Sequence, residues 1–196
     1  MKKLWTDLHS NIHHNQMDEL DKWTEHAKDV LDFWPIAYYP FQMIKTESGA
    51  GLEDLCPEEE IKKDWEIVRR KVKEENANGY PMFMGYEWQG CGFDGDHNVF
   101  FLDNEQDMKH PMRYQELRDD YKDTEAIGIP HHVAYQLGSR GKNWATHDEN
   151  FSPFAEIYSS HGCSENDTGG MDMERHLHMG PRTGETCYER GLEAGL

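Results

Sequence analysis

Residues Leu4 to His14, LWTDLHSNIHH, combine an apolar start with one acid and three histidines. Side chains of a strand alternate between two faces, so Asp7 and His9 would share one face of a strand here. Zinc, manganese and iron accept mixed nitrogen and oxygen ligands, which must converge to within about 2.0–2.3 Å of the ion. The segment therefore predicts a strand that delivers metal ligands. The alternative is a surface histidine beside a helix cap.

The composition indicates a folded, acidic domain. The chain has 196 residues, 36% of them hydrophobic and 12% aromatic, which is enough for the core of a single domain spanning residues 1–196. Twenty lysines and arginines stand against 38 acids, and the formal net charge of -18 disfavours nucleic acids and anionic membranes as partners. Bound divalent cations would offset part of this charge, although a solvated surface explains most of it.

The cysteines and the N-terminus predict a cytoplasmic protein. The four cysteines are widely spaced and form no CxxC pair, so we expect reduced thiols and no zinc ribbon. No apolar run approaches the roughly 18 residues of a membrane span. Met1-Lys2-Lys3 leads directly into strand-like sequence, without the apolar core of a signal peptide.

Strands and helices alternate along the chain, which predicts an α/β fold. Helices are expected after the capping residue Asn15, from Pro57 to Asn78 and over residues 111–122. Strands are expected over residues 33–39, 82–88, 97–102, 126–130 and 154–159. The stretch up to about residue 56 is predicted to be a loop. Its residues 46–51, TESGAG, fit either a mobile lid or a solvated excursion.

Several side chains that can bind metals lie at the ends of these predicted strands. Glu87 interrupts an apolar strand, and a buried carboxylate is costly unless it is paired or holds a cation. His97 opens the next strand, near the same rim. His131 follows the strand over 126–130, and His161 follows the strand over 154–159. This distribution favours a site at the carboxyl ends of the strands.

Six short motifs together resemble the PHP domain, in particular the branch related to carbaryl hydrolase. They are DLH at 7–9, LDF at 31–33, GYEW at 85–88, DHNVFF at 96–101, IPHH at 129–132 and EIYSSHGCSE at 156–165. Their order and spacing cover nearly the whole chain. The resemblance implies a distorted (β/α)7 TIM-like barrel that binds two or three divalent metals, such as zinc, manganese or iron, and hydrolyses phosphoesters, carbamates or other esters.

The resemblance also implies roles for individual residues. His9 matches the first histidine of the opening HxH motif, Glu87 the glutamate in the middle of the barrel, and His131 and His161 the later histidine ligands. A small-molecule ester would be the substrate, and Asp7 or His97 would move a proton while a metal-activated water attacks. The sequence carries no sign of the oligomeric state.

The chain departs from the family pattern at two ligand positions. Asn11 stands at the second histidine of HxH, and Tyr39-Pro40 stands where the family has Asp-His. His13 and His14 are close enough along the chain to replace the missing ligands. The chain also stops at Leu196, before the expected last Asp-x-His pair, which predicts a barrel that is incomplete at its C-terminus. These departures leave a non-catalytic metal- or ligand-binding domain as the alternative to a hydrolase.

Overall fold

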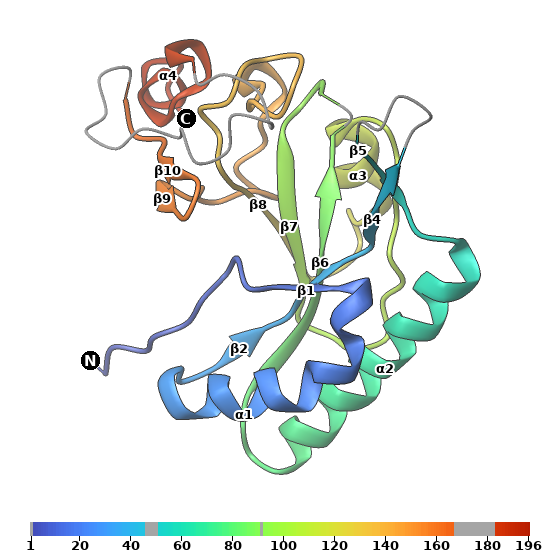
Figure 1. Cartoon of the computed structure of the whole chain (residues 1–196). Coiled ribbons are helices and arrows are strands. Elements are labelled where there is room, and N and C mark those ends of the chain that lie inside the picture. Colours follow the sequence, from blue (N-terminus) through green and yellow to red (C-terminus); the bar gives the residue numbers. More distant parts are fainter. Residues whose placement is uncertain (1, 46–50, 91, 167–182) are drawn as a thin grey trace. The chain divides into compact units, whose positions relative to one another are not determined.

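The computed structural model describes residues 2–45, 51–90, 92–166 and 183–196. It shows an α/β protein with a mixed six-stranded sheet (Figure 1). The strand order is β1 (Asn11–His13), β3 (Ala37–Tyr39), β6 (Met82–Gln89), β7 (Asp96–Phe101) and β8 (Ala126–Pro130), and β2 (Trp34–Pro35) also pairs with β6. Within the described residues the sheet stays open between β1 and β8, and no closed barrel is seen. The incomplete (β/α)7 barrel expected from the sequence stays a prediction.

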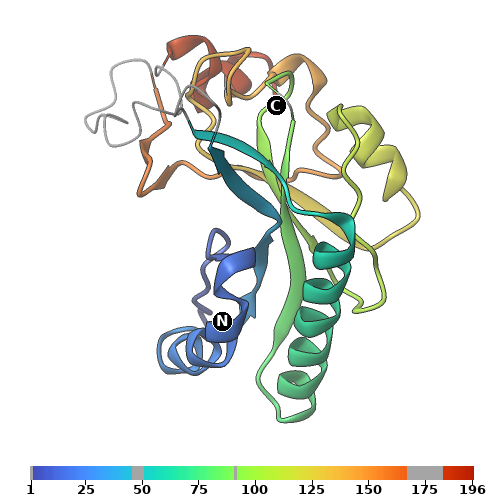
Figure 2. The same ribbon diagram turned by 45° about the vertical axis from the view of Figure 1, so that its right-hand side comes forward.

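Contacts divide the chain into two compact units, and the first comprises Met1–Glu87 and Phe100–Gln106. In this unit η1 (His14–Glu19) leads into α1 (Leu20–Val30), and α2 (Glu58–Ala77) runs beside β6 (Figure 2). The ion pairs Lys28–Glu75 and Lys71–Asp21 link the two α-helices. The apolar residues of α2 recur at helical spacing and are buried, namely Ile61, Trp65, Val68 and Val72.

The strand register gives the first unit's part of the sheet two different faces. Ile12 pairs with Tyr38, and Tyr38 pairs with Tyr86, so these three buried side chains share one face. Trp65 of α2 packs against Tyr38 and Tyr86, with ring centroids 6.4 and 6.1 Å apart. The alternating residues must therefore lie on the face opposite α2. They are Asn11, His13, Tyr39 and Glu87.

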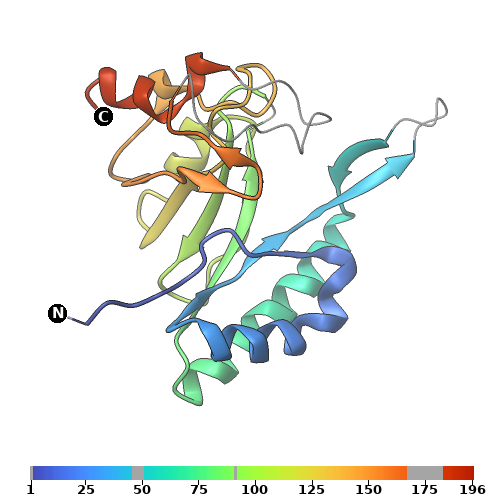
Figure 3. The same ribbon diagram turned by 60° about the vertical axis from the view of Figure 1, so that its left-hand side comes forward.

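The segment after β3 contains a hairpin that the sequence analysis did not predict. β4 (Phe41–Lys45) and β5 (Gly51–Leu55) pair antiparallel, from Phe41 opposite Leu55 to Lys45 opposite Gly51, and project beyond the helices of the first unit (Figure 3). The loop prediction for residues 40–56 was therefore wrong over both strands. The question of a lid at 46–51 falls almost entirely on residues 46–50, which lie outside the described residues.

The second unit comprises Trp88–Val99 and Asp107–Leu196. Besides β8 it holds α3 (Tyr114–Asp120), η2 (Trp144–Thr146), the β9–β10 hairpin (Tyr158–Ser159 and Gly162–Cys163), η4 (Gly184–Thr186) and α4 (Tyr188–Glu193). A Cβ on Gly141 would lie 1.9 Å from the Tyr135 carbonyl oxygen, so only glycine allows this close approach of the backbone. The predicted strand over 154–159 is confirmed only at its last two residues.

In the described part of the chain, no helix is both long enough and apolar enough to cross a membrane. No disulfide joins the described cysteines Cys56, Cys163 and Cys187.

Candidate metal centre

Glu87 lies near the end of β6, on the face opposite α2, and is only 2% exposed. Asn11 of β1 donates a hydrogen bond from Nδ2 to Glu87 Oε2 at 2.7 Å. The negative charges of Glu87 and Glu53 raise the pKa of His13, but burial outweighs them and lowers that pKa below its usual value. The carboxylate that interrupts an otherwise apolar strand is thus surrounded by the polar residues of this face.

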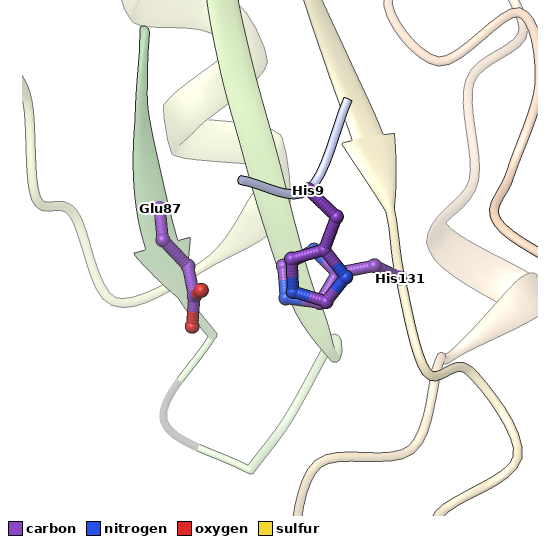
Figure 4. A group of neighbouring side chains, drawn as sticks. All are labelled: His9, Glu87 and His131. Atoms are coloured by element: carbon purple, nitrogen blue, oxygen red, sulfur yellow. The ribbon is translucent and has the colours of Figure 1, made fainter. Parts of the chain in front are cut away.

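The structure brings three of the predicted metal ligands together (Figure 4). His9, Glu87 and His131 each offer one ligand atom, and these atoms all lie within 4.8 Å of one another. His9 is partly buried, whereas His131 is 1% exposed. Each of the three residues follows or closes a strand that was expected from the sequence, and three of the four residues expected to meet at one site lie together, His161 being the fourth.

The donor set fits a divalent transition metal. Two imidazole nitrogens and one carboxylate oxygen form a mixed set that zinc, manganese and iron accept. Ligands on opposite sides of one ion lie at most roughly 4.4 Å apart, so the three donors need only small side-chain adjustments to share an ion. The group could therefore hold a metal ion.

Three other residues that were expected at the site lie outside this group, namely Asp7, His13 and His14. Asp7 is exposed, and its Oδ1 accepts a hydrogen bond from the backbone N–H of His9 at 2.8 Å. The His13 ring packs against Tyr39, with centroids 4.5 Å apart. His14 Nδ1 lies 2.6 Å from Asp64 Oδ2, so this ring anchors η1 to α2. Its Nε2 lies 3.1 Å from Glu60 Oε2, so both ring nitrogens of His14 contact carboxylates of α2.

His97 is buried in the second unit rather than joined to the group. Its Nε2 lies 3.2 Å from Nζ of Lys142, and its ring stacks on Tyr114 with centroids 4.8 Å apart. Burial, and next the positive charge of Lys142, hold the pKa of His97 well below its usual value. A neutral histidine in this position packs and hydrogen-bonds within its own unit.

Lys142 is a feature that the sequence analysis missed. Its side chain is 1% exposed, and Nζ lies 4.1 Å from the centre of the Tyr114 ring. Burial lowers the pKa of Lys142 to about 7, although the charge of Asp94 opposes this shift. Nothing in the polar segment around Lys142 indicated burial, because its side chain packs against His97 and Tyr114, which come much earlier in the chain.

We expect the free energy of unfolding to rise with pH between about 7 and 10, by up to about 1.4 kcal/mol per pH unit. In this window Lys142 is still protonated in the unfolded chain but not in the folded chain, because folding lowers the pKa of Lys142. Urea unfolding at several pH values measures the slope. Lys142→Met should flatten it, and Lys63→Met on the exposed surface of α2 is the control. An unchanged slope in Lys142→Met would show that the lowered pKa of Lys142 is not the cause of the pH dependence.

His161 occupies a histidine cluster within the second unit. Its Nδ1 lies 3.0 Å from the Tyr135 hydroxyl, and its ring centroid is 4.5 Å from that of His132. His132 adopts a positive φ of 37°, and its backbone N–H donates to Glu156 Oε1 at 3.1 Å. The predicted ligand His161 therefore contacts the neighbour of His131, while the three-residue group itself does not include it.

Comparison of the chain with protein-family models, with curated proteins and with solved structures gave no match. The likeness to the PHP domain thus rests on the six motifs alone. The structure adds that the ligand atoms of His9, Glu87 and His131 lie close together.

Proposed function

We propose that the protein is a cytoplasmic metal-dependent hydrolase of the PHP type that acts on a small phosphoester, carbamate or other ester. The observation that supports this proposal is the convergence of His9, Glu87 and His131. In this proposal the open six-stranded sheet corresponds to part of the distorted barrel of that family.

The three residues would hold the ion, and the chain would supply the surroundings. A divalent ion bound there would lower the pKa of a water molecule toward 7 and polarise the phosphoryl or carbonyl oxygen under attack. Glu87 would contribute the negative charge that offsets part of the ion's charge, and Asn11 would hold one of its oxygens by a hydrogen bond. Because His9 is only partly buried, the site would be reached from its side.

A non-catalytic metal-binding domain is the second candidate, and a specific observation favours it. Asp7 and His97 were the expected proton carriers, but Asp7 is exposed and bonded to the His9 backbone, and His97 is buried against Lys142 and Tyr114. Hydrolysis would then need another proton carrier, whereas metal binding needs none.

Turnover by the metal-loaded protein separates the two candidates. The protein is stripped with a chelator, reloaded with zinc, manganese or iron(II), and assayed on an aryl phosphodiester, an aryl phosphomonoester, an aryl carbamate and an aryl ester. We expect metal-dependent hydrolysis of at least one class, lost in His131→Ala. Tight metal binding without turnover of any class would support the non-catalytic domain instead, and an absence of metal binding would exclude both.

A further inference from the structure

Asn11 lies beside the candidate metal centre. Of the two polar atoms of its side-chain amide, only the nitrogen has a hydrogen-bond partner among the described residues. Nδ2 donates to Glu87 Oε2 at 2.7 Å. Oδ1 is buried and accepts no hydrogen bond from the residues that the structure describes. A buried amide oxygen without a donor costs about 1–3 kcal/mol, so a buried Oδ1 beside a carboxylate calls for a positive partner.

The chemistry of Glu87 fixes which way the amide faces. An ionised carboxylate only accepts hydrogen bonds, so the amide nitrogen must be the atom that meets it. Oδ1 is then directed away from Oε2 but stays next to it, since both amide atoms are attached to the same carbon. A backbone or side-chain donor would satisfy Oδ1, but none of the described residues provides one. A cation would satisfy it equally well.

The position of Asn11 on the strand supports the same conclusion. Asn11 and His13 alternate with the fully buried Ile12, so they lie on the same face of the sheet as Glu87 of β6. Asn11 is also two residues from His9, which offers a ligand atom to the group. The amide thus belongs to a short strand that begins two residues after one ligand, His9, and it is hydrogen-bonded to another ligand, Glu87.

We propose that Asn11 is a fourth metal ligand that binds the ion through Oδ1 while its Nδ2 holds Glu87. The centre would then have two nitrogen and two oxygen donors, one of them a neutral amide oxygen. Amide and carboxylate oxygens suit manganese and magnesium, whereas imidazole suits zinc. Asn11 would therefore shift the metal preference of this centre toward manganese. The inference rests on the proposed metal centre and adds a ligand and a selectivity to it.

Metal affinity of four variants tests this ligand without using activity. Dissociation constants for manganese and for zinc alone are measured by titration calorimetry on the stripped wild type and on Asn11→Ala, Asn11→Asp, Asn11→His and the exposed control Asn15→Ala. We expect Asn11→Ala to weaken binding of both ions by about 10- to 100-fold or more. The loss of an outer-shell residue typically weakens metal binding by about 10- to 100-fold, and the loss of a ligand should weaken it at least as much. Asn11→Asp keeps an oxygen donor and should bind both ions at least as tightly as the wild type does. Asn11→His should raise the affinity for zinc relative to that for manganese by about tenfold or more.

The Asp variant distinguishes a ligand from a residue that only orients Glu87. Aspartate cannot donate the hydrogen bond to Oε2, so a purely orienting role predicts that Asn11→Asp binds as weakly as Asn11→Ala. That result, or unchanged affinities in Asn11→Ala, would overturn the inference while leaving the three-residue centre in place. A wild type that binds neither ion would reject the centre itself. Circular dichroism shows that each variant is folded, and the Asp variant keeps the test valid where the alanine variant does not fold.

Discussion

Replacing Glu87 by glutamine should weaken metal binding by more than about 100-fold, because the anionic ligand becomes a neutral amide, a larger change than the loss of an outer-shell partner, which typically costs about 10- to 100-fold. Glu87 is the only carboxylate of the three-residue group, and it is 2% exposed. Glutamine has the same shape and can still meet the Asn11 amide after rotation of its own amide. The metal-free protein should therefore fold as well as the wild type or better, since a buried charge is removed.

Glu53→Gln is the matched control for this variant. Glu53 is an acid of β5 that accepts a hydrogen bond from the Tyr39 hydroxyl, and it lies outside the three-residue group. Calorimetric titration with zinc and with manganese should show a near-native affinity for Glu53→Gln. A native affinity in Glu87→Gln would mean that Glu87 is not a metal ligand. An equal loss of affinity in both variants would mean that the general negative charge of this region, and not Glu87 itself, attracts the ion.

Replacing Trp65 by alanine should lower the free energy of unfolding by about 3–5 kcal/mol, the usual cost of removing a large aromatic side chain from a core. Trp65 is 3% exposed and contacts the rings of Tyr38, Tyr86 and Phe101. Its Nε1 also donates a hydrogen bond to the Gln106 carbonyl oxygen at 2.9 Å. Truncation would leave a cavity between α2 and the sheet and would remove one of two hydrogen bonds to the Gln106 carbonyl oxygen, the other coming from Arg69 Nη2.

Urea unfolding followed by far-UV circular dichroism measures this loss. Trp23→Ala is the control, because Trp23 of α1 is 38% exposed and its removal should cost much less. Similar losses in the two variants would contradict the view that the packing of α2 on the sheet dominates the stability of the first unit.

The sequence predicted the elements whose apolar pattern matches their burial. The helical spacing of Ile61, Trp65, Val68 and Val72 was sufficient for α2, and the apolar run around Tyr86 was sufficient for β6. These elements are buried on the side that the pattern indicates, so local sequence and tertiary packing agree.

The first strand was misplaced because alternation alone does not show what a segment pairs with. Leu4 and Trp5 are 56% and 69% exposed, and the backbone of Trp5 bonds to Asp32 instead of joining the sheet. The strand begins at Asn11, where Ile12 enters the core. The strand predicted over 154–159 was mostly wrong for a similar reason, since Phe154 and Ile157 remain 44% and 43% exposed.

The candidate centre was predicted in part, because strand ends can be located from sequence but side-chain partners cannot. His9, Glu87 and His131 were expected together and are found together. His14 was expected near them, yet Asp64, 50 residues away in the chain, binds its ring. The Asn11–Glu87 bond spans 76 residues, and the sequence offered Asn11 only as a missing histidine. Such partners depend on the register of distant strands.

Anomalous X-ray scattering from crystals of the stripped protein soaked with zinc or manganese locates the bound ion itself. We predict a peak with donors from His9, Glu87 and His131 at about 2.0–2.3 Å. A peak bound by other residues, or no peak at this position while the three side chains are ordered, would contradict it.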